Sequence, residues 1–219
     1  MRQGVLGGTF DPIHVGHLDV ARAAAAALTL DRVQLMPSNL PPHRTAPQAS
    51  ARDRLAMVEL AAEGDPKLVA SDLELHADGP SYTTTTLDRL AGSGVDLMTL
   101  FFITGADAFR DIPTWRNYPA ILDRCHFVVV SRPGCRAGSL RQVLPAVAPR
   151  MIDAPCAIPS YPSVILVDAP TAPVSSTEVR QRLASGGSID GLVPPAVASY
   201  IERHGLYRTP HSKEPNGQS

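Results

Sequence analysis

The chain has 219 residues, and it is poor in aromatic residues, cysteine and lysine, with no excess of either charge. Aromatic residues make up 5% of it, so a folded core must rest chiefly on Ala, Val, Leu and Ile. Twenty Lys and Arg residues stand against 21 Asp and Glu residues, which argues against nucleic-acid binding through bulk positive charge. A small phosphate ligand needs only a few local donors and is compatible with this balance.

Cysteine usage and the lack of long apolar runs indicate a cytoplasmic protein. The three cysteines are odd in number and lack C-x-x-C spacing, which favours reduced thiols over a disulfide framework. No stretch approaches the roughly 18 apolar residues that suggest a membrane span. The apolar N-terminal run is short and is followed at once by polar residues, unlike a signal peptide. We therefore expect no membrane and no nucleic acid among the partners.

Short apolar segments alternate with helical patterns along most of the chain. The segments expected as strands are 3–7, 32–36, 67–73, 98–104, 126–131 and 164–168, and those expected as helices are 16–28, 51–62, 83–91, 115–123 and 140–147. Several strand segments are apolar throughout, as is typical of parallel strands buried on both faces. This order predicts an α/β fold with a doubly wound parallel sheet, whose ligands bind beyond the carboxyl ends of the strands.

The end of the chain differs from the rest. Residues 175–184 and 195–204 are expected as two helices with no strand between them, forming a small helical cap. We predict one domain over 1–208, with an α/β core at about 1–170 and a helical C-terminal subdomain at about 171–208. Residues 209–219 are polar, contain two prolines and are expected to be a disordered tail.

The first expected strand runs into the sequence GGTFDPIHVGH at residues 7–17. Gly7 and Gly8 allow a sharp turn that brings backbone N–H groups close to a ligand. A helix begins soon afterwards, and its N-terminus favours an anion. His14 and His17 are three residues apart, so at a helix start both lie on one face and point toward the loop. The pattern predicts a phosphate-binding loop, although it matches neither G-x-G-x-x-G nor the P-loop.

Two other interpretations of these histidines are open at this point. One is structural, with a glycine turn, one histidine capping the helix and the other packed in the core. The other is a zinc site at H-x-x-H, which is weaker because zinc needs three or four ligands and no neighbouring Cys or Glu completes the set. We predict no metal ligands in the chain.

A second candidate phosphate site is the sequence SSTEVR at residues 175–180. The spacing of Ser175 and Glu178 is that of a capping box, which predicts a helix beginning at Ser175. Helical side chains tilt toward the N-terminus, so Arg180 lies beside Thr177 and the free N–H groups. Hydroxyls and one guanidinium make an anion site. A capped surface helix with a solvated arginine is the alternative for this segment alone.

Both segments resemble signatures of the nucleotidyltransferase superfamily. Residues 14–17 match its H-x-G-H element, which binds a nucleoside triphosphate, and residues 175–180 are similar to its S-S-T-x-[IV]-R element, which holds the β- and γ-phosphates of ATP. The resemblance implies His14, His17 and Arg180 as catalytic residues. It implies an ATP site formed by Gly7, Gly8, Thr9, Phe10, His14, Gly16, His17, Gly105, Asp107, Ser175, Ser176, Thr177 and Arg180.

Further segments bear on the second substrate. Arg44 adds a positive charge after the second strand, residues 80–83 precede a helix, and Trp115 follows the fourth strand between Thr114 and Arg116, which favours a rim position over the core. In this order, from residue 4 to about 207, they resemble the bacterial nicotinate-nucleotide adenylyltransferase family. The resemblance implies that nicotinate mononucleotide contacts Gly8, Thr9, Arg44, Tyr82, Thr83, Trp115 and Arg132.

Two positions depart from the family pattern. Arg44 stands where Lys is often found, and the two side chains are not equivalent. Residues 76–78 are His, Ala and Asp, where an arginine often precedes the Gly-Pro-Ser-Tyr element. Any contact made by that arginine is in doubt here.

The resemblance implies transfer of AMP from ATP to nicotinate mononucleotide, with pyrophosphate leaving. The attacking phosphate has a second pKa of about 6 and is largely dianionic at neutral pH, so no general base is needed. We assign His17 to the α-phosphate, His14 to the neighbouring phosphates, and Ser176, Thr177 and Arg180 to the leaving pyrophosphate. Mg²⁺ is the expected cofactor, held mainly by ATP oxygens and water.

The sequence leaves several alternatives. The acceptor is nicotinate mononucleotide in the favoured reading, and nicotinamide mononucleotide or phosphopantetheine in the rival one. A catalytically silent nucleotide-binding protein is opposed by the intact histidines and the intact 175–180 segment. A fragment of a class I aminoacyl-tRNA synthetase is opposed by the chain's size and its lack of basic excess. A homo-oligomer is compatible with the sequence.

Overall fold

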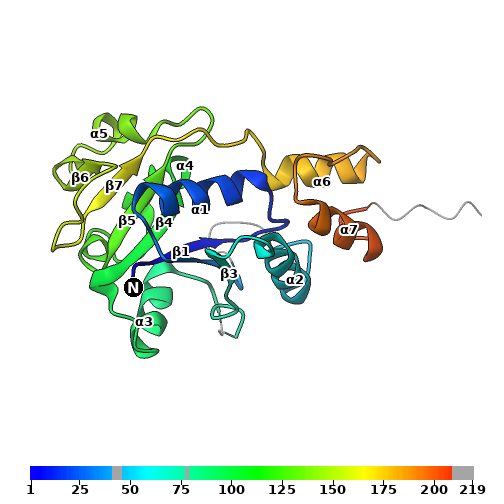
Figure 1. Cartoon of the computed structure of the whole chain (residues 1–219), viewed down its shortest axis with the longest axis horizontal. Helices are drawn as coiled ribbons and strands as arrows, with labels where there is room; N and C mark the ends of the chain where they lie inside the picture. Colours follow the sequence, from blue (N-terminus) through cyan, green and yellow to red (C-terminus); the bar gives the residue numbers. More distant parts are fainter. Residues whose placement is uncertain (41–45, 77–78, 209–219) are drawn as a thin grey trace, which may run out of the picture.

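The computed structural model describes residues 1–40, 46–76 and 79–208. Within them, seven parallel strands form one sheet in the order β3-β2-β1-β4-β5-β7-β6 (Figure 1). The strands are β1 (Gln3–Gly8), β2 (Arg32–Pro37), β3 (Leu68–Ala70), β4 (Leu100–Gly105), β5 (His126–Val130), β6 (Met151–Asp153) and β7 (Val164–Val167). The predicted doubly wound parallel sheet is confirmed.

Seven α-helices accompany the sheet in the described ranges. They are α1 (Val15–Ala27), α2 (Ala51–Ala62), α3 (Thr83–Gly92), α4 (Ala106–Phe109), α5 (Leu140–Val143), α6 (Ser176–Ala184) and α7 (Pro195–Arg203). Figure 1 shows α6 and α7 at one end of the molecule, beside α2 and away from α5 and β6. No helix of the described ranges has the length and apolar character to cross a membrane.

Alternate side chains of the strands supply two hydrophobic clusters, one on each face of the sheet. In β4, Phe101 and Ile103 belong to the first cluster, and Leu100 and Phe102 belong to the second. The first cluster is completed by α1, α2, α6 and α7, and the second by α3, α4 and α5. Burial on both faces explains why the strand segments read as continuous apolar runs.

The order of the strands reverses between β1 and β4. The chain moves outward from β1 to β2 and β3, then returns to the other side of β1 with β4 and continues to β5. A crevice opens at such a point beyond the carboxyl ends of the strands. Gly7 and Gly8 end β1 there, and Gly105 ends β4, so three of the predicted site residues meet at this crevice.

Two predicted helices are only partly confirmed, for local reasons. The predicted helix 140–147 ends as α5 after Val143, because Pro145 disfavours a helical conformation at the preceding Leu144, whose ψ is 64°. The predicted helix 115–123 is limited to a 3₁₀ turn at Ala120–Asp123. Asn117 has a positive φ of 64°, which is incompatible with a right-handed helix running through residues 115–119.

Smaller differences between the predicted and observed elements concern two strands, and some predicted features lie outside the described residues. The edge strand β6 was not predicted, and β3 covers three residues of the expected 67–73. Arg44, Ala77, Asp78 and the expected tail at 209–219 lie outside the described residues.

The two C-terminal helices are confirmed within a residue of their expected bounds. Val179 of α6 and Val197 and Ile201 of α7 are fully buried in the first hydrophobic cluster. The Tyr200 hydroxyl of α7 donates a hydrogen bond of 2.9 Å to Asp53 of α2. The helical C-terminal segment therefore packs on the core, and its description as a separate subdomain stays a prediction.

Candidate active site

The turn after β1 is shaped by Phe10. Its backbone has a positive φ of 49°, and its ring is 1% exposed and belongs to the first hydrophobic cluster. A Cβ on Gly8 would lie 2.8 Å from this ring, so only glycine fits there. Gly7 is exposed near the end of the central strand, which it shares with Gly8. Phe10 was predicted as an ATP contact, but its ring is buried in the core beneath the turn. Gly7 and Gly8 lie on the more accessible side of the turn.

His14 and His17 stack on each other at the start of α1, with ring centroids 3.6 Å apart. The backbone N–H of His14 donates to Nδ1 of His17 at 3.3 Å. Because an accepting ring nitrogen carries no proton, a neutral His17 has its proton on Nε2. The Phe10 ring meets His17 edge-on at a centroid distance of 5.0 Å and limits its rotation.

His14 is almost fully buried, with 2% of its surface exposed. Burial, together with the positive charge of Arg132, lowers the pKa of His14 to about 3. The ring is therefore neutral at physiological pH, and its Nδ1 has no hydrogen-bond partner within the described residues. A buried polar atom without a hydrogen-bond partner carries a free-energy cost.

The backbone at the start of α1 is less open than the sequence suggested. The Val15 N–H donates to the Leu192 carbonyl at 3.0 Å, and the His17 N–H donates to the His14 carbonyl at 2.9 Å. These N–H groups are engaged within the chain. The imidazoles are thus better placed than the helix backbone to contact an anion at this end of α1.

Arg132, which follows β5, joins α1 to the segment before α6. Its Nη1 donates to the Gly16 carbonyl at 3.0 Å, and its Nη2 donates to the Val174 carbonyl at 3.1 Å. A Cβ on Gly16 would lie 2.8 Å from Nη1 of Arg132, and one on Gly105 would lie 3.0 Å from its Cγ. Both glycines therefore make room for this arginine. Its guanidinium supports the loop.

The start of α6 lies against the β1–α1 loop, as its predicted role requires. The Ser176 hydroxyl donates to the Pro12 carbonyl at 2.8 Å, and Nη1 of Arg180 donates to the Asp11 carbonyl at 2.7 Å. Nη2 of Arg180 donates to the Thr177 hydroxyl at 3.4 Å, so the side chain curls back as expected. Two segments more than 160 positions apart in the sequence thus share one site.

Ser175 is the N-cap of α6, and its hydroxyl accepts from the Glu178 N–H at 3.1 Å. This confirms the capping function predicted from the sequence. Ser175 and Thr177 are exposed, as is Asp107 in the first turn of α4. Asp107 follows Gly105 at the carboxyl end of β4, across the crevice from the β1 loop.

Two of the acceptor residues predicted from the sequence, Tyr82 and Thr83, lie at the start of α3. Tyr82 is the N-cap of α3 and Thr83 is its first residue. The guanidinium of Arg116 lies 5.0 Å from the centroid of the Tyr82 ring. Trp115 is half-buried, packs on the second hydrophobic cluster and meets Phe127 at a centroid distance of 6.4 Å. Part of the indole is therefore packed in the core, and part is exposed. This placement is intermediate between the core position and the rim position considered from the sequence.

A bridge links this region to the end of β2. The Asn39 N–H donates to the Ser81 hydroxyl at 2.9 Å, and the Ser81 N–H donates to the Leu40 carbonyl at 2.8 Å. The segment before α3 is thereby held to the chain that leads from β2 to Arg44. The position of Arg44 itself is outside the described residues.

Arg54 of α2 was not found from the sequence. It is 2% exposed, and its Nη1 donates to the Thr9 carbonyl at 2.8 Å and to the Ser38 carbonyl at 2.7 Å. It ties the end of the β1 loop to the end of β2. A signal was present, because Arg54 shares the helix face of the buried Met57, Val58 and Ala61, where an unpaired charge is not tolerated.

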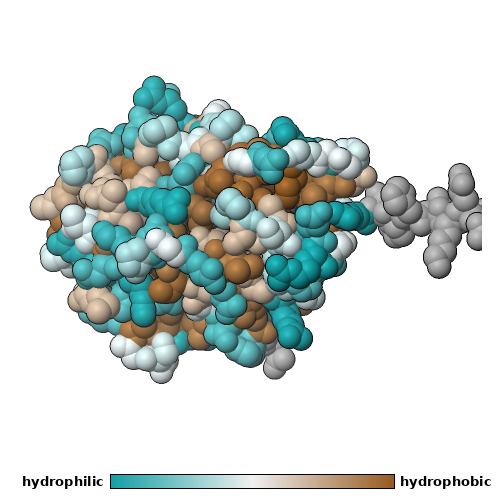
Figure 2. Space-filling model, turned by 45° about the vertical axis from the view of Figure 1, so that its right-hand side comes forward, coloured by the Kyte–Doolittle hydropathy of each residue, from teal (hydrophilic) through white to brown (hydrophobic). Residues whose placement is uncertain are grey.

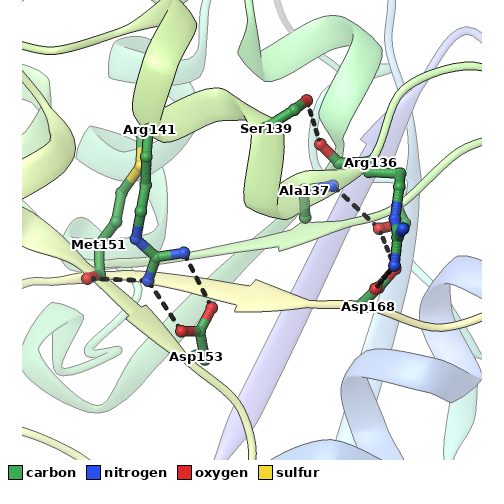
Figure 3. A network of polar contacts seen from close by, with 8 residues as sticks. Arg136, Ala137, Ser139, Arg141, Met151, Asp153 and Asp168 are labelled. Atoms are coloured by element: carbon green, nitrogen blue, oxygen red, sulfur yellow. Dashed lines mark hydrogen bonds and ion pairs between the residues drawn. The ribbon is translucent and has the colours of Figure 1, made fainter.

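Two cavities lie beyond the ends of β5 and β7. One of about 390 Å³ is lined by Ser131, Arg132, Pro133, Arg136, Asp168, Ala169, Pro170 and Thr171, and one of about 450 Å³ lies on the other side of Arg136 and Asp168. Figure 3 shows the guanidinium of Arg136 facing the carboxylate of Asp168. Nη2 of Arg136 lies 2.7 Å from Oδ2 of Asp168. The first cavity adjoins the crevice through Arg132, and neither is lined by the histidines.

Figure 2 shows a surface on which hydrophilic and hydrophobic residues are mixed, with one larger hydrophobic area bordered by hydrophilic residues.

No group of three or more His, Cys, Asp or Glu side chains placed to hold a metal ion occurs among residues 1–40, 46–76 and 79–208. The groups that converge at the crevice are imidazoles, hydroxyls and guanidinium groups, which suit phosphate oxygens.

Comparison with known proteins fits this site. Residues 5–182 match the family model described as cytidylyltransferase-like, so the chain belongs to that family and is a nucleotidyltransferase. A Pseudomonas fluorescens protein named as a probable nicotinate-nucleotide adenylyltransferase is 45% identical over 215 residues, covering 96% of this chain and 99% of that protein. A Pseudomonas syringae protein of the same name is 43% identical over 213 residues, covering 96% of each. Within the class, the chain belongs to the nicotinate-nucleotide adenylyltransferase family.

A solved structure supports the fold. The nicotinic acid mononucleotide adenylyltransferase of Plasmodium falciparum, complexed with NaAD, superposes with a TM-score of 0.70 at 18% identity. The match covers 94% of this chain and 96% of that one. The predicted nucleotidyltransferase fold is thus confirmed over nearly the whole chain.

Proposed function

We propose that the chain transfers AMP from ATP to nicotinate mononucleotide, giving deamido-NAD and pyrophosphate. The observation that carries this proposal is the meeting of α1 and α6 at the β1 loop, where Ser176 and Arg180 bond to the carbonyls of Pro12 and Asp11. Such a site suits a triphosphate that crosses the sheet edge between β1 and β4. The names of the relatives support the acceptor.

The reaction needs alignment and charge stabilisation more than proton transfer. Two anions must be brought together, and charge must be stabilised on the oxygens of the α-phosphate and on the leaving pyrophosphate. His17, which in its neutral form carries its proton on Nε2 when Nδ1 accepts from the His14 backbone, is assigned to the α-phosphate. The neutral, buried His14 is assigned to the neighbouring phosphates.

The leaving pyrophosphate is assigned to α6. Arg180 is only partly exposed and is held from behind by the Asp11 carbonyl, so its guanidinium is ordered before ATP binds. The exposed Thr177 hydroxyl lies beside it. The Ser176 hydroxyl donates a hydrogen bond to the Pro12 carbonyl, and the backbone N–H of Ser176 is one of the first-turn N–H groups of α6.

The start of α3 is proposed to take the pyridine carboxylate. Tyr82 caps α3 without a side-chain hydrogen bond to the helix, and Thr83 begins it. First-turn N–H groups and the helix dipole favour a carboxylate over a neutral amide, which favours nicotinate over nicotinamide. The open part of Trp115 is assigned to stacking on the ring, as the sequence suggested.

Mg²⁺ is proposed as the cofactor, and it would neutralise charge on the triphosphate. The chemistry of the donors decides where it would bind. The groups at the loop donate hydrogen bonds or carry positive charge, and the buried carboxylate of Asp11 already accepts from Gln48, Ala49 and Tyr207. Oxygens of ATP and water would therefore supply most of the ligands.

A pyrophosphate-release assay tests the proposal. The purified chain is given ATP and Mg²⁺ with nicotinate mononucleotide, nicotinamide mononucleotide or phosphopantetheine in parallel reactions. We expect fastest release with nicotinate mononucleotide, with deamido-NAD identified as the product by mass. Faster release with another acceptor would contradict the acceptor assignment, and release with none would contradict the reaction.

A further inference from the structure

Asp11, between the β1 turn and α1, holds three parts of the chain together. It is 5% exposed. Its Oδ2 accepts from the Gln48 N–H at 2.8 Å, and its Oδ1 accepts from the Ala49 N–H at 3.0 Å and from the Tyr207 hydroxyl at 2.7 Å. Its backbone carbonyl accepts from Nη1 of Arg180 at 2.7 Å. One residue thus joins the segment entering α2, the end of the described chain and the phosphate-binding arginine.

Two arginine guanidinium groups lie near the Asp11 carboxylate. Nη1 of Arg180 lies 4.0 Å from Oδ2 of Asp11. The buried guanidinium of Arg54 also interacts with this charge. Burial and the Asp11 carboxylate raise the pKa of Tyr207, which keeps its hydroxyl protonated and donating. These charges and donors define one orientation of the Asp11 side chain.

We propose that Asp11 is a positioning residue for AMP transfer, which acts by holding Arg180 in the orientation that binds the triphosphate. Its three side-chain hydrogen bonds fix the residue whose backbone carbonyl holds the guanidinium. Asp11 makes no contact with the substrate in this scheme. The inference rests on the proposed function, because it assigns Arg180 to the phosphates.

Asp11→Asn is the informative change, because it alters charge and hydrogen bonding with little change of shape. Either orientation of the amide sets an NH₂ group against a backbone N–H donor of Gln48 or Ala49, so at least one bond is lost. Misplacement of a binding group by about 1 Å can cost up to about 100-fold in rate. We expect kcat/KM for ATP to fall roughly 10- to 100-fold, with a higher KM for ATP.

A double-mutant cycle separates positioning from a general loss of stability. Asp11→Asn, Arg180→Ala and the double variant are compared by kcat/KM for ATP. If Asp11 acts through Arg180, Asp11→Asn changes kcat/KM by less than about 3-fold once Arg180 is absent. Effects that multiply independently would overturn the proposal.

Two further variants keep the test decisive. Tyr207→Phe removes a single donor to Asp11 and should give a smaller loss of the same non-additive kind, so it replaces Asp11→Asn in the cycle if that variant does not fold. Asp65→Asn is the matched control, since this carboxylate binds Arg22 and the Lys67 N–H just before the amino end of β3, whereas the site lies beyond the carboxyl ends of the strands. Its KM for ATP should be unchanged. A wild-type chain without pyrophosphate release would refute the proposed function itself, whereas independent effects in an active enzyme refute only the role of Asp11.

Discussion

The N-termini of α1 and α6 face the same loop but carry different kinds of side chain. At α1, a buried neutral imidazole stacks on a second one, and the first backbone N–H is bonded to Leu192. At α6, hydroxyls and a guanidinium attach to the loop through hydrogen bonds to the Pro12 and Asp11 carbonyls. The first end is part of the hydrophobic core, and the second is a polar surface held against it.

This difference assigns different tasks to the two ends. A donor fixed by packing has little freedom to follow the substrate, so it suits charge that appears only in the transition state. An arginine that is partly exposed binds phosphate in the ground state as well. Changes at α1 should therefore act mainly on kcat, and changes at α6 should act more on the KM for ATP.

The largest effect is expected for His17→Ala. Removing one donor to charge in the transition state costs about 2.7–4 kcal/mol, or roughly 100- to 1,000-fold in kcat. Equilibrium binding of ATP should change much less. Steady-state pyrophosphate release and calorimetric titration with ATP measure the two quantities.

The control for this variant is His204→Ala, which removes an imidazole that stacks on Tyr200 in a different region. It should leave kcat unchanged. A His17→Ala enzyme with near wild-type kcat would remove the basis for distinguishing the two helix ends.

Arg180→Ala comes next in size. A hydrogen bond to a charged group contributes about 1.5–3 kcal/mol, so the KM for ATP should rise roughly 10- to 100-fold. Arg182→Ala is the matched control on the same helix, because Arg182 pairs with Glu178 on the exposed side. Initial rates across a range of ATP concentrations measure the effect. If both arginine variants had the same KM, α6 would have no special part in binding the triphosphate.

A third effect concerns stability and pH. The pKa of His14 is lowered from 6.5 to about 3 in the folded chain, so between these values the unfolded chain binds the proton and the folded chain does not. The free energy of unfolding therefore falls as the pH is lowered through this range, by at most about 1.4 kcal/mol per pH unit for one proton.

His14→Gln removes this proton and should flatten the pH dependence. Denaturant unfolding of both proteins between pH 7 and about pH 4 measures the difference in slope. Equal slopes would show that the folded chain protonates His14 as easily as the unfolded chain does, and the contrast between a buried α1 end and a polar α6 end would weaken.

Much of the site could be predicted because its residues form short local patterns. The residues of HVGH and SSTEVR need only a helix start to bring their side chains onto one face, and that start is signalled by capping residues. Arg54 and Asp11 were not predicted to support the site, because their partners are distant in sequence. Arg54 bonds to Thr9 and Ser38. Asp11 bonds to Gln48 and Tyr207. Spacing carries no information about such contacts.

The errors in the fold have a similar origin. Helical periodicity in 140–147 outweighed Pro145, whose restriction on Leu144 ends the helix. The strand β6 is three residues long at the sheet edge, too short for its pattern to stand out.

The amino-acid sequence by itself determined the alternation of strands and helices, the parallel sheet and both candidate phosphate-binding segments, because hydrophobic periodicity and helix capping act over a few neighbouring residues. Only the tertiary structure decided that these segments meet at one loop, that His14 is neutral and buried, and that Asp11 stands behind Arg180. Those properties depend on which distant groups exclude water and supply charge around each side chain, and packing alone sets that.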